Sequence, residues 1–105
     1  MKLTDLEPKF RKLNEAGQLQ EVETIEEAEV VTYLCPKCFL KNGGAVGTHL
    51  FMTPNKKLQP GTLGGKIYWE WTGKGMDDLT TNPSILDVGG CGAHFYIKNG
   101  EIEMV

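Results

Sequence analysis

The sequence has 105 residues, a formal net charge of −3 and three cysteines. This length suits a single domain, and the sequence holds neither an apolar run of the roughly 18 residues that span a bilayer nor the apolar core of a signal peptide. We therefore expect a cytoplasmic protein with no membrane contact, whose cysteines stay reduced. The acidic balance disfavours nucleic acid as a partner.

The acidic residues are concentrated at the N-terminal end. Residues 1–34 hold four Lys or Arg against eight Asp or Glu, whereas residues 35–105 hold seven against six. A cluster of glutamates in this segment is typical of a solvated face, and a docking surface for another protein is the alternative. Its members are Glu21, Glu23, Glu26, Glu27 and Glu29.

The first residues carry the pattern of a short helix. Apolar side chains recur at intervals of three and four residues, at Leu3, Leu6, Phe10 and Leu13. Thr4 and Glu7 can form a capping box, and Gly17 follows where such a helix would end. We therefore treat residues 1–29 as a helical, acidic N-terminal segment and residues 30–105 as the β core of one zinc-binding domain. Residues 19–29 lack a clean period and fit a short strand or a helical turn.

Three later segments have the composition of β-strands, namely residues 30–34, 46–53 and 66–72. In the third segment, alternation places Ile67, Trp69 and Trp71 on one face. We expect the two tryptophans to fill the core. A stacking platform for bases or sugars is the alternative, but Glu70 interrupts the aromatic row and a basic groove is missing.

The C-terminus predicts a β-hairpin, because Asn99-Gly100 is the preferred pair for a two-residue type I′ turn. The turn sets the register by placing Lys98 opposite Glu101. The pairs that follow outward are Ile97 with Ile102, Tyr96 with Glu103, and Phe95 with Met104. One face of this hairpin is therefore apolar, and it is expected to cover the core.

Two pairs of residues with chelating spacing carry the chemistry of the sequence. Cys35 and Cys38 form one pair in CPKC, and Cys91 and His94 form the other in CGAH. Together they predict one tetrahedral Cys3His site for structural zinc, in which four protein ligands leave no open position for catalysis. A redox CxxC is disfavoured because these cysteines follow a strand and enter a turn, and unliganded thiols are the remaining alternative.

Acid–base catalysis would require a polar cleft near Asp77, Asp78, Asp87 or His49. We expect the aspartates to serve turns, because they lie beside glycines. His49 is interpreted as a surface or hydrogen-bonded residue whose replacement by alanine should be mild.

The segment from Trp71 to the C-terminus, with TTNPSIL, Gly90-Cys91-Gly92, His94 and KNGE, resembles a family of small phage and prophage proteins of unknown function that often carry an ammonia monooxygenase label. MKLTDLEPKF and CPKC resemble the same family. The resemblance implies that Cys35, Cys38, Cys91 and His94 are the metal ligands. It also implies a buried structural turn at Pro83-Ser84-Ile85.

The sequence thus predicts a small, mainly β domain with a zinc-ribbon-like core, an N-terminal helix and a C-terminal hairpin. The favoured function is that of a non-catalytic phage accessory protein in the host cytoplasm, which binds a host or viral protein. A more specific form of this hypothesis is that it inhibits a host enzyme. A small hydrolase is one alternative. The other is a nucleic-acid-binding zinc ribbon, which would require several lysines to gather on one side: Lys37, Lys41, Lys56, Lys57, Lys66 and Lys74.

Overall fold

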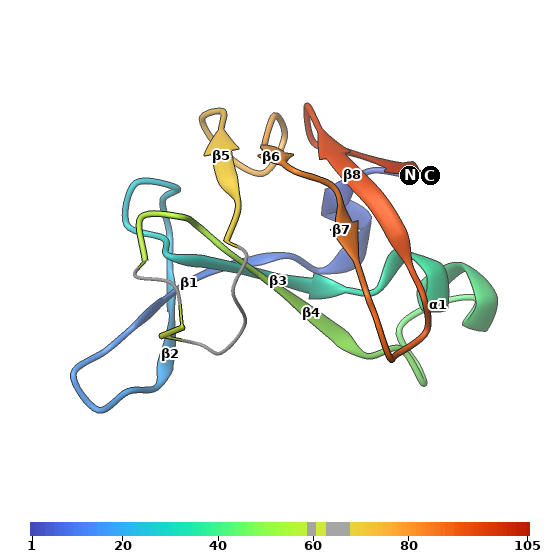
Figure 1. Ribbon diagram of the computed structural model, residues 1–105, viewed down its shortest axis with the longest axis horizontal. Helices are drawn as coiled ribbons and strands as arrows, with labels where there is room; N and C mark the ends of the chain where they lie inside the picture. Colours follow the sequence, from blue (N-terminus) through green and yellow to red (C-terminus); the bar gives the residue numbers. More distant parts are fainter. Residues whose placement is uncertain (59–60, 63–67) are drawn as a thin grey trace.

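The structure is a computed structural model that describes residues 1–58, 61–62 and 68–105 (Figure 1). It is a small, mainly β domain whose strands form three antiparallel sheets, with one short α-helix. The broad fold prediction is therefore confirmed. No helix in the described residues is long and apolar enough to cross a membrane.

The largest sheet contains four strands in the order β2-β1-β3-β4. Its strands are β1 (Lys9–Leu13), β2 (Leu19–Val22), β3 (Val30–Leu34) and β4 (Leu50–Pro54). All five residues of β3 are buried, as expected for a β-branched and aromatic strand paired on both sides. The helix α1 (Pro36–Asn42) connects β3 to β4 and ends at Gly43, which adopts a left-handed conformation.

Two smaller sheets follow in the second half of the chain. One pairs β5 (Glu70–Thr72) with β6 (Thr80–Asn82), and the other contains β7 (Ile85–Leu86), β8 (His94–Lys98) and β9 (Glu101–Met104) in that order. The predicted strand over residues 66–72 is thus observed at its C-terminal end. Ile67, which we placed on its apolar face, lies outside the described residues.

The predicted N-terminal helix is wrong beyond Leu6. A 3₁₀-helix, η1 (Leu3–Leu6), is followed by Glu7 in a left-handed conformation and then by β1. Glu7 and Pro8 stop the helix because neither continues its backbone geometry. The apolar residues that suggested one helix therefore belong to two elements. Leu3 and Leu6 of η1 and Phe10 of β1 are all buried. Segment 1–29 contributes the strands β1 and β2, which belong to the same sheet as β3.

The C-terminal hairpin is confirmed in every predicted pair, from Lys98 opposite Glu101 to Phe95 opposite Met104. Asn99 and Gly100 both have positive φ angles, as a type I′ turn requires.

The core lies between the four-stranded sheet and the sheet β7–β9 (Figure 1). Tyr33 from β3 meets Phe95 from β8 edge to face, with their ring centroids 6.1 Å apart. Phe51 from β4 packs on the same Phe95 ring at 5.6 Å. The hydroxyl of Tyr33 is hydrogen-bonded to that of Thr53 at 2.7 Å, in a fully buried position. This packing fixes β4 and β8, the two strands next to the candidate site.

Candidate functional site: a Cys3His cluster beside a serine–histidine pair

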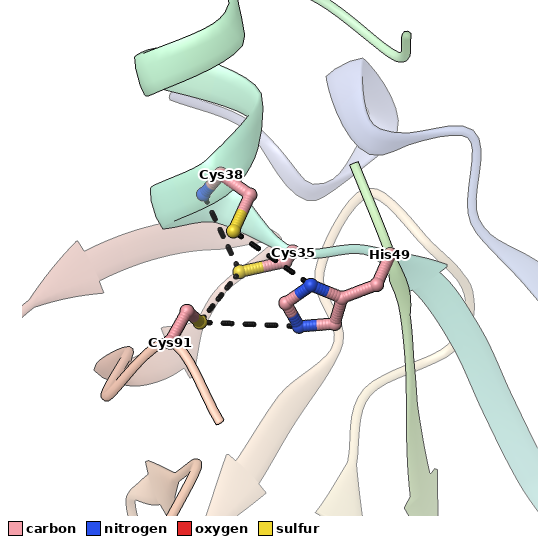
Figure 2. Close-up of side chains that lie close together, drawn as sticks. All are labelled: Cys35, Cys38, His49 and Cys91. Atoms are coloured by element: carbon pink, nitrogen blue, oxygen red, sulfur yellow. Dashed lines mark hydrogen bonds between the residues drawn. The ribbon is translucent and has the colours of Figure 1, made fainter. Parts of the chain in front are cut away.

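All three cysteines of the sequence converge on one point, together with His49 (Figure 2). The ligand atoms of Cys35, Cys38, His49 and Cys91 lie within 4.8 Å of one another. The Sγ atoms of Cys35 and Cys91 are 3.5 Å apart. The His49 ring lies between the other sulfurs, with Nδ1 3.7 Å from Sγ of Cys38 and Nε2 3.9 Å from Sγ of Cys91.

These separations suit a tetrahedral metal ion. Two ligand atoms bound to one tetrahedral zinc at about 2.3 Å lie ~3.8 Å from each other, which is close to the distances found here. The donor set of three thiols and one imidazole is also the one that structural zinc sites use. The cluster is therefore able to bind a metal ion, as the sequence predicted.

The first pair of cysteines is positioned by the start of α1. Cys35 is the N-cap residue of this helix, and its sulfur accepts a hydrogen bond from the backbone N–H of Cys38 at 3.4 Å. Pro36 occupies the first helical position, where a fixed φ and a missing N–H cost nothing. One turn of helix then returns Cys38 to the side of Cys35, so the pair chelates from a helix start.

His49 reaches the cluster through the segment between α1 and β4. Gly43 and Gly47 turn the backbone there with positive φ angles. The hydroxyl of Thr48 donates to the C=O of Gly44 at 2.7 Å, and the C=O of His49 accepts from the N–H of Cys35 at 2.9 Å. The last bond extends the β3–β4 ladder by one pair, which places His49 beside Cys35.

Cys91 is held by the neighbouring Asp87. The carboxylate Oδ2 of Asp87 accepts from the backbone N–H of Cys91 at 3.0 Å, and it lies 3.8 Å from Nε2 of His49. A Cβ atom at Gly90 would be 2.1 Å from this oxygen, so a side chain there would displace the carboxylate. Asp87 thus shapes the loop around Cys91 and contacts a second member of the cluster, as carboxylates near metal ligands commonly do.

Burial raises the pKa of the Cys35 thiol to about 12. The neighbouring sulfurs act in the same direction, whereas the hydrogen bond from Cys38 opposes them. A cation that binds here must therefore displace a firmly held proton, and its own charge supplies the stabilisation that the thiolates lack.

His94 does not join the three cysteines, although its spacing from Cys91 predicted that it would. Ala93 is buried, and its C=O already accepts from the N–H of Asp87 at 2.9 Å, so the chain is extended before His94 is reached. Side chains alternate along a strand, which places His94 on the face opposite Ala93 and Phe95. Cys91 instead is the last residue of the turn over residues 88–91, and it is followed by Gly92, where φ is +74°.

His94 contacts Ser84. Its Nε2 atom lies 3.0 Å from Oγ of Ser84, and both side chains are half-buried. In the register of β7 and β8, Leu86 is opposite His94 and Ile85 is opposite Phe95. One further residue along, Ser84 is diagonal to His94 on the outer face of the sheet, a separation that side chains can bridge. The Asn82–Pro83 peptide bond just before Ser84 is cis.

This pair has the geometry of a nucleophile and its base. A neutral imidazole at hydrogen-bonding distance can take the hydroxyl proton as the oxygen attacks a carbonyl carbon. Within residues 1–58, 61–62 and 68–105, no carboxylate is hydrogen-bonded or ion-paired to the His94 ring. The described arrangement is therefore a dyad.

Three more of the residues considered from the sequence have structural contacts, namely Asp78, Trp69 and Trp71. Asp78 Oδ1 accepts from the backbone N–H groups of Lys74 and Gly75, at 2.8 and 3.0 Å, as expected for turn chemistry. Trp71 packs on Phe10 with a centroid distance of 6.3 Å. Trp69 packs against the core as well, and its Nε1 donates to the C=O of Ser84 at 3.4 Å.

A comparison with protein families matches residues 6–105 to the family described as bacterial ubiquitination-like system serine protease (BubE). The chain belongs to the BubE family. No curated protein and no solved structure gave a match. The family is thus not the group of phage proteins of unknown function that the sequence resembled, and the interpretation as a non-catalytic accessory or inhibitor protein is corrected.

The BubE match also changes the interpretation of Ser84, which the sequence analysis placed in a buried structural turn. Ser84 is the only serine in the sequence, so in this chain it is the one residue that can be the nucleophile of a serine protease. Of the two histidines, His94 lies beside it and His49 lies beside the cysteines. The sequence contains one serine and two histidines, so few pairs of a serine nucleophile and a histidine base were possible. The CxxH spacing nevertheless led us to assign His94 to the metal site.

Proposed function

We propose that the chain is a serine protease in which Ser84 is the nucleophile and His94 is the general base. The observation that carries this proposal is the 3.0 Å contact between Oγ of Ser84 and Nε2 of His94 in a member of a serine protease family. The outer face of the sheet supports it, because both side chains are partly exposed there and a substrate can reach them.

The reaction follows from the roles of the two groups. Nε2 of His94 accepts the hydroxyl proton as Oγ of Ser84 attacks the peptide carbonyl carbon, and the resulting imidazolium gives this proton to the leaving amine. This step leaves an ester between Ser84 and the acyl part of the substrate. Water then attacks the ester with His94 again as the base, which releases the carboxylic acid and restores the hydroxyl.

The substrate in this proposal is a polypeptide. The family description names a bacterial ubiquitination-like system, so the proteins of such a system are the first substrates to test. The net charge of −3 agrees with a protein substrate better than with nucleic acid.

The test is covalent labelling by a fluorophosphonate, which reacts with activated serines and needs no knowledge of the substrate. We expect one adduct per chain on Ser84 in the peptide map, and we expect its rate to fall strongly in His94→Ala. Ser84→Ala is the control for labelling elsewhere. A folded wild-type protein that gives no adduct would refute the proposal.

We further propose that Cys35, Cys38, His49 and Cys91 hold one zinc ion with a structural role. Four protein ligands complete a tetrahedral shell and leave no position for water or substrate. The support is the convergence of these four side chains and the Asp87 carboxylate beside His49 and Cys91. Elemental analysis of purified protein tests it, with one zinc per chain expected in wild type and in His94→Ala.

A further inference from the structure

Among the residues that the structure describes, no strand pairs with the outer edge of β7, which lies next to the proposed nucleophile. β7 is the terminal strand in the order β7-β8-β9, so that only one of its sides is covered by β8 (Figure 1). Antiparallel ladders alternate between residues that bond to the neighbouring strand and residues whose backbone groups face away from it. Which residues face the open side can therefore be assigned.

The observed hydrogen bonds make this assignment. The N–H of Asp87 donates to the C=O of Ala93 at 2.9 Å, so Asp87 is a residue that bonds to β8. By alternation Ile85 also bonds to β8, whereas the backbone groups of Ser84 and Leu86 face the open edge. The hydrogen bond of the Ser84 C=O to the Trp69 indole, on the side away from β8, agrees with this assignment.

Leu86 is the free position on this edge. Among the residues that the structure describes, none is hydrogen-bonded to its backbone N–H or C=O. Two contacts mark the ends of the edge, the indole of Trp69 at Ser84 and the approach of Asp87 to His49 at the cluster. The side chain of Leu86 is 52% exposed and that of Val88 is 83% exposed, so two apolar side chains are accessible beside this edge.

We propose that the polypeptide substrate binds as an extended strand on the free edge of β7, paired through the N–H and C=O of Leu86. This inference rests on the proposed protease function. Strand addition uses main-chain hydrogen bonds for affinity, and the exposed Leu86 and Val88 favour apolar substrate side chains. Ser84 lies two residues from Leu86, about 6.6 Å along a strand, so a strand paired at Leu86 reaches the nucleophile within two of its own residues.

The experiment compares two serine-reactive probes, a diphenyl phosphonate with a single small residue and the same group extended by an acetylated tripeptide of alanine and valine. In wild type we expect the tripeptide to raise the rate of Ser84 labelling about tenfold, the effect of one or two hydrogen bonds. Leu86→Pro removes the outward N–H without removing a bond to β8, because proline is tolerated where an edge N–H faces solvent. We expect this variant to lose the gain from the tripeptide.

A matched variant is available on β4, which is also the terminal strand of a sheet. β4 is the terminal strand of the four-stranded sheet, and Met52 lies in its middle. Because His49 bonds to Cys35 of the neighbouring strand, alternation places the backbone N–H of Met52 on the side of β4 that faces away from β3. Met52→Pro should keep the gain from the tripeptide. Loss of the gain in Met52→Pro but not in Leu86→Pro would move the binding edge to β4 and overturn the inference.

A third arm needs no variant, so that a folding defect in Leu86→Pro does not decide the result. Tripeptide probes methylated at one amide nitrogen at a time are tested on wild type, and we expect one methyl group to abolish the gain.

Labelling by the short probe without any gain from the tripeptide would refute the strand addition alone. Labelling by neither probe would refute the protease function as well. A wild-type dimer that Leu86→Pro converts to a monomer would show that a second copy covers this edge, which also overturns the inference.

Discussion

The Oγ atom of Ser84 lies 3.0 Å from Nε2 of His94 because β7 and β8 place the two residues diagonally on one face of a sheet. The same short segment of chain contains Cys91, which belongs to the metal cluster. The proposed nucleophile, a cysteine of the cluster and the proposed base therefore follow one another along a single strand–loop–strand unit. The loop that the metal would clamp is the one that connects the two members of the dyad.

Replacement of His94 should abolish catalysis without unfolding the protein. Both members of the dyad are on the outer face of the sheet, where substitutions usually change stability by less than about 0.5 kcal/mol. We expect His94→Ala and Ser84→Ala each to lower the rate of peptide hydrolysis by about 10³-fold or more, and the double variant to be no worse than either. Steady-state kinetics and thermal melting check this. Additive losses in the double variant would contradict a shared proton transfer.

The assignment of His49 to the metal cluster predicts that cysteine, but not alanine, can replace it. His49→Cys supplies a fourth thiolate, and four cysteines are a normal ligand set for zinc. His49→Ala should lose the zinc and more than about 4 kcal/mol of stability, since metal binding at a structural site contributes directly to folding. Zinc content and denaturant unfolding are the measurements. A mild His49→Ala variant that keeps its zinc would return this residue to the surface role that the sequence suggested.

Removal of the proposed zinc ion should disable the dyad, because its proposed role is to hold the loop that connects Ser84 and His94. The loop between Asp87 and Ala93 is anchored through Cys91, and a loose loop lets Ser84 and His94 separate. We expect a zinc chelator to reduce the rate of fluorophosphonate labelling in parallel with zinc loss, and added zinc to restore it. Full labelling of zinc-free, folded protein would show that the dyad is independent of the cluster.

The parts of this fold that could be predicted from the sequence are those that local chemistry decides. The C-terminal register followed from Asn99-Gly100, because a type I′ turn leaves one pairing for the strands around it. The buried strand β3 followed from its β-branched and aromatic residues. The N-terminal segment failed because Leu3, Leu6 and Phe10 fit a helical period, yet a left-handed residue at Glu7 divides them between two elements.

The candidate site depends on contacts between distant segments, so spacing alone misassigned its histidines. Cys91 and His94 have chelating spacing, but His94 is committed to the sheet face that it shares with Ser84. His49 has no nearby cysteine in the sequence and reaches the cluster only because the β3–β4 pairing places it next to Cys35. The spacing of residues along the chain therefore cannot show which histidine joins the cysteines.

The buried hydrogen bond between Tyr33 and Thr53 should appear as a coupling between their substitutions. Tyr33→Phe leaves the Thr53 hydroxyl buried without its partner, which costs about 1–3 kcal/mol. Tyr33→Phe combined with Thr53→Val removes both polar groups, so we expect a loss smaller than the sum of the two single variants. Tyr96→Phe on the outer face of the sheet, where the ring is half-buried, is the matched control and should change the unfolding free energy by less than about 0.5 kcal/mol. Strict additivity would mean that this bond adds nothing to stability.

The turn at Asp78 should contribute to the acid sensitivity of the fold. Hydrogen bonds from the backbone N–H groups of Lys74 and Gly75 hold the pKa of the Asp78 carboxyl below its usual value. The unfolded chain therefore binds this proton more readily than the folded chain. It follows that the contribution of Asp78 to stability is present above the unfolded pKa, about 3.9, and is lost as the pH falls through the lower folded pKa.

Asp78→Asn tests this linkage, because asparagine has no carboxyl group to titrate. We expect the variant to be less stable than wild type at pH 6, and we expect the difference to shrink as the pH is lowered towards 3. Urea unfolding at a series of pH values measures it. Asp77→Asn changes the net charge by the same amount but leaves both hydrogen bonds to Asp78 in place, and it should keep the wild-type slope. A stability difference for Asp78→Asn that stays constant between pH 6 and 3 would show that the turn is stabilised without regard to the charge of this side chain.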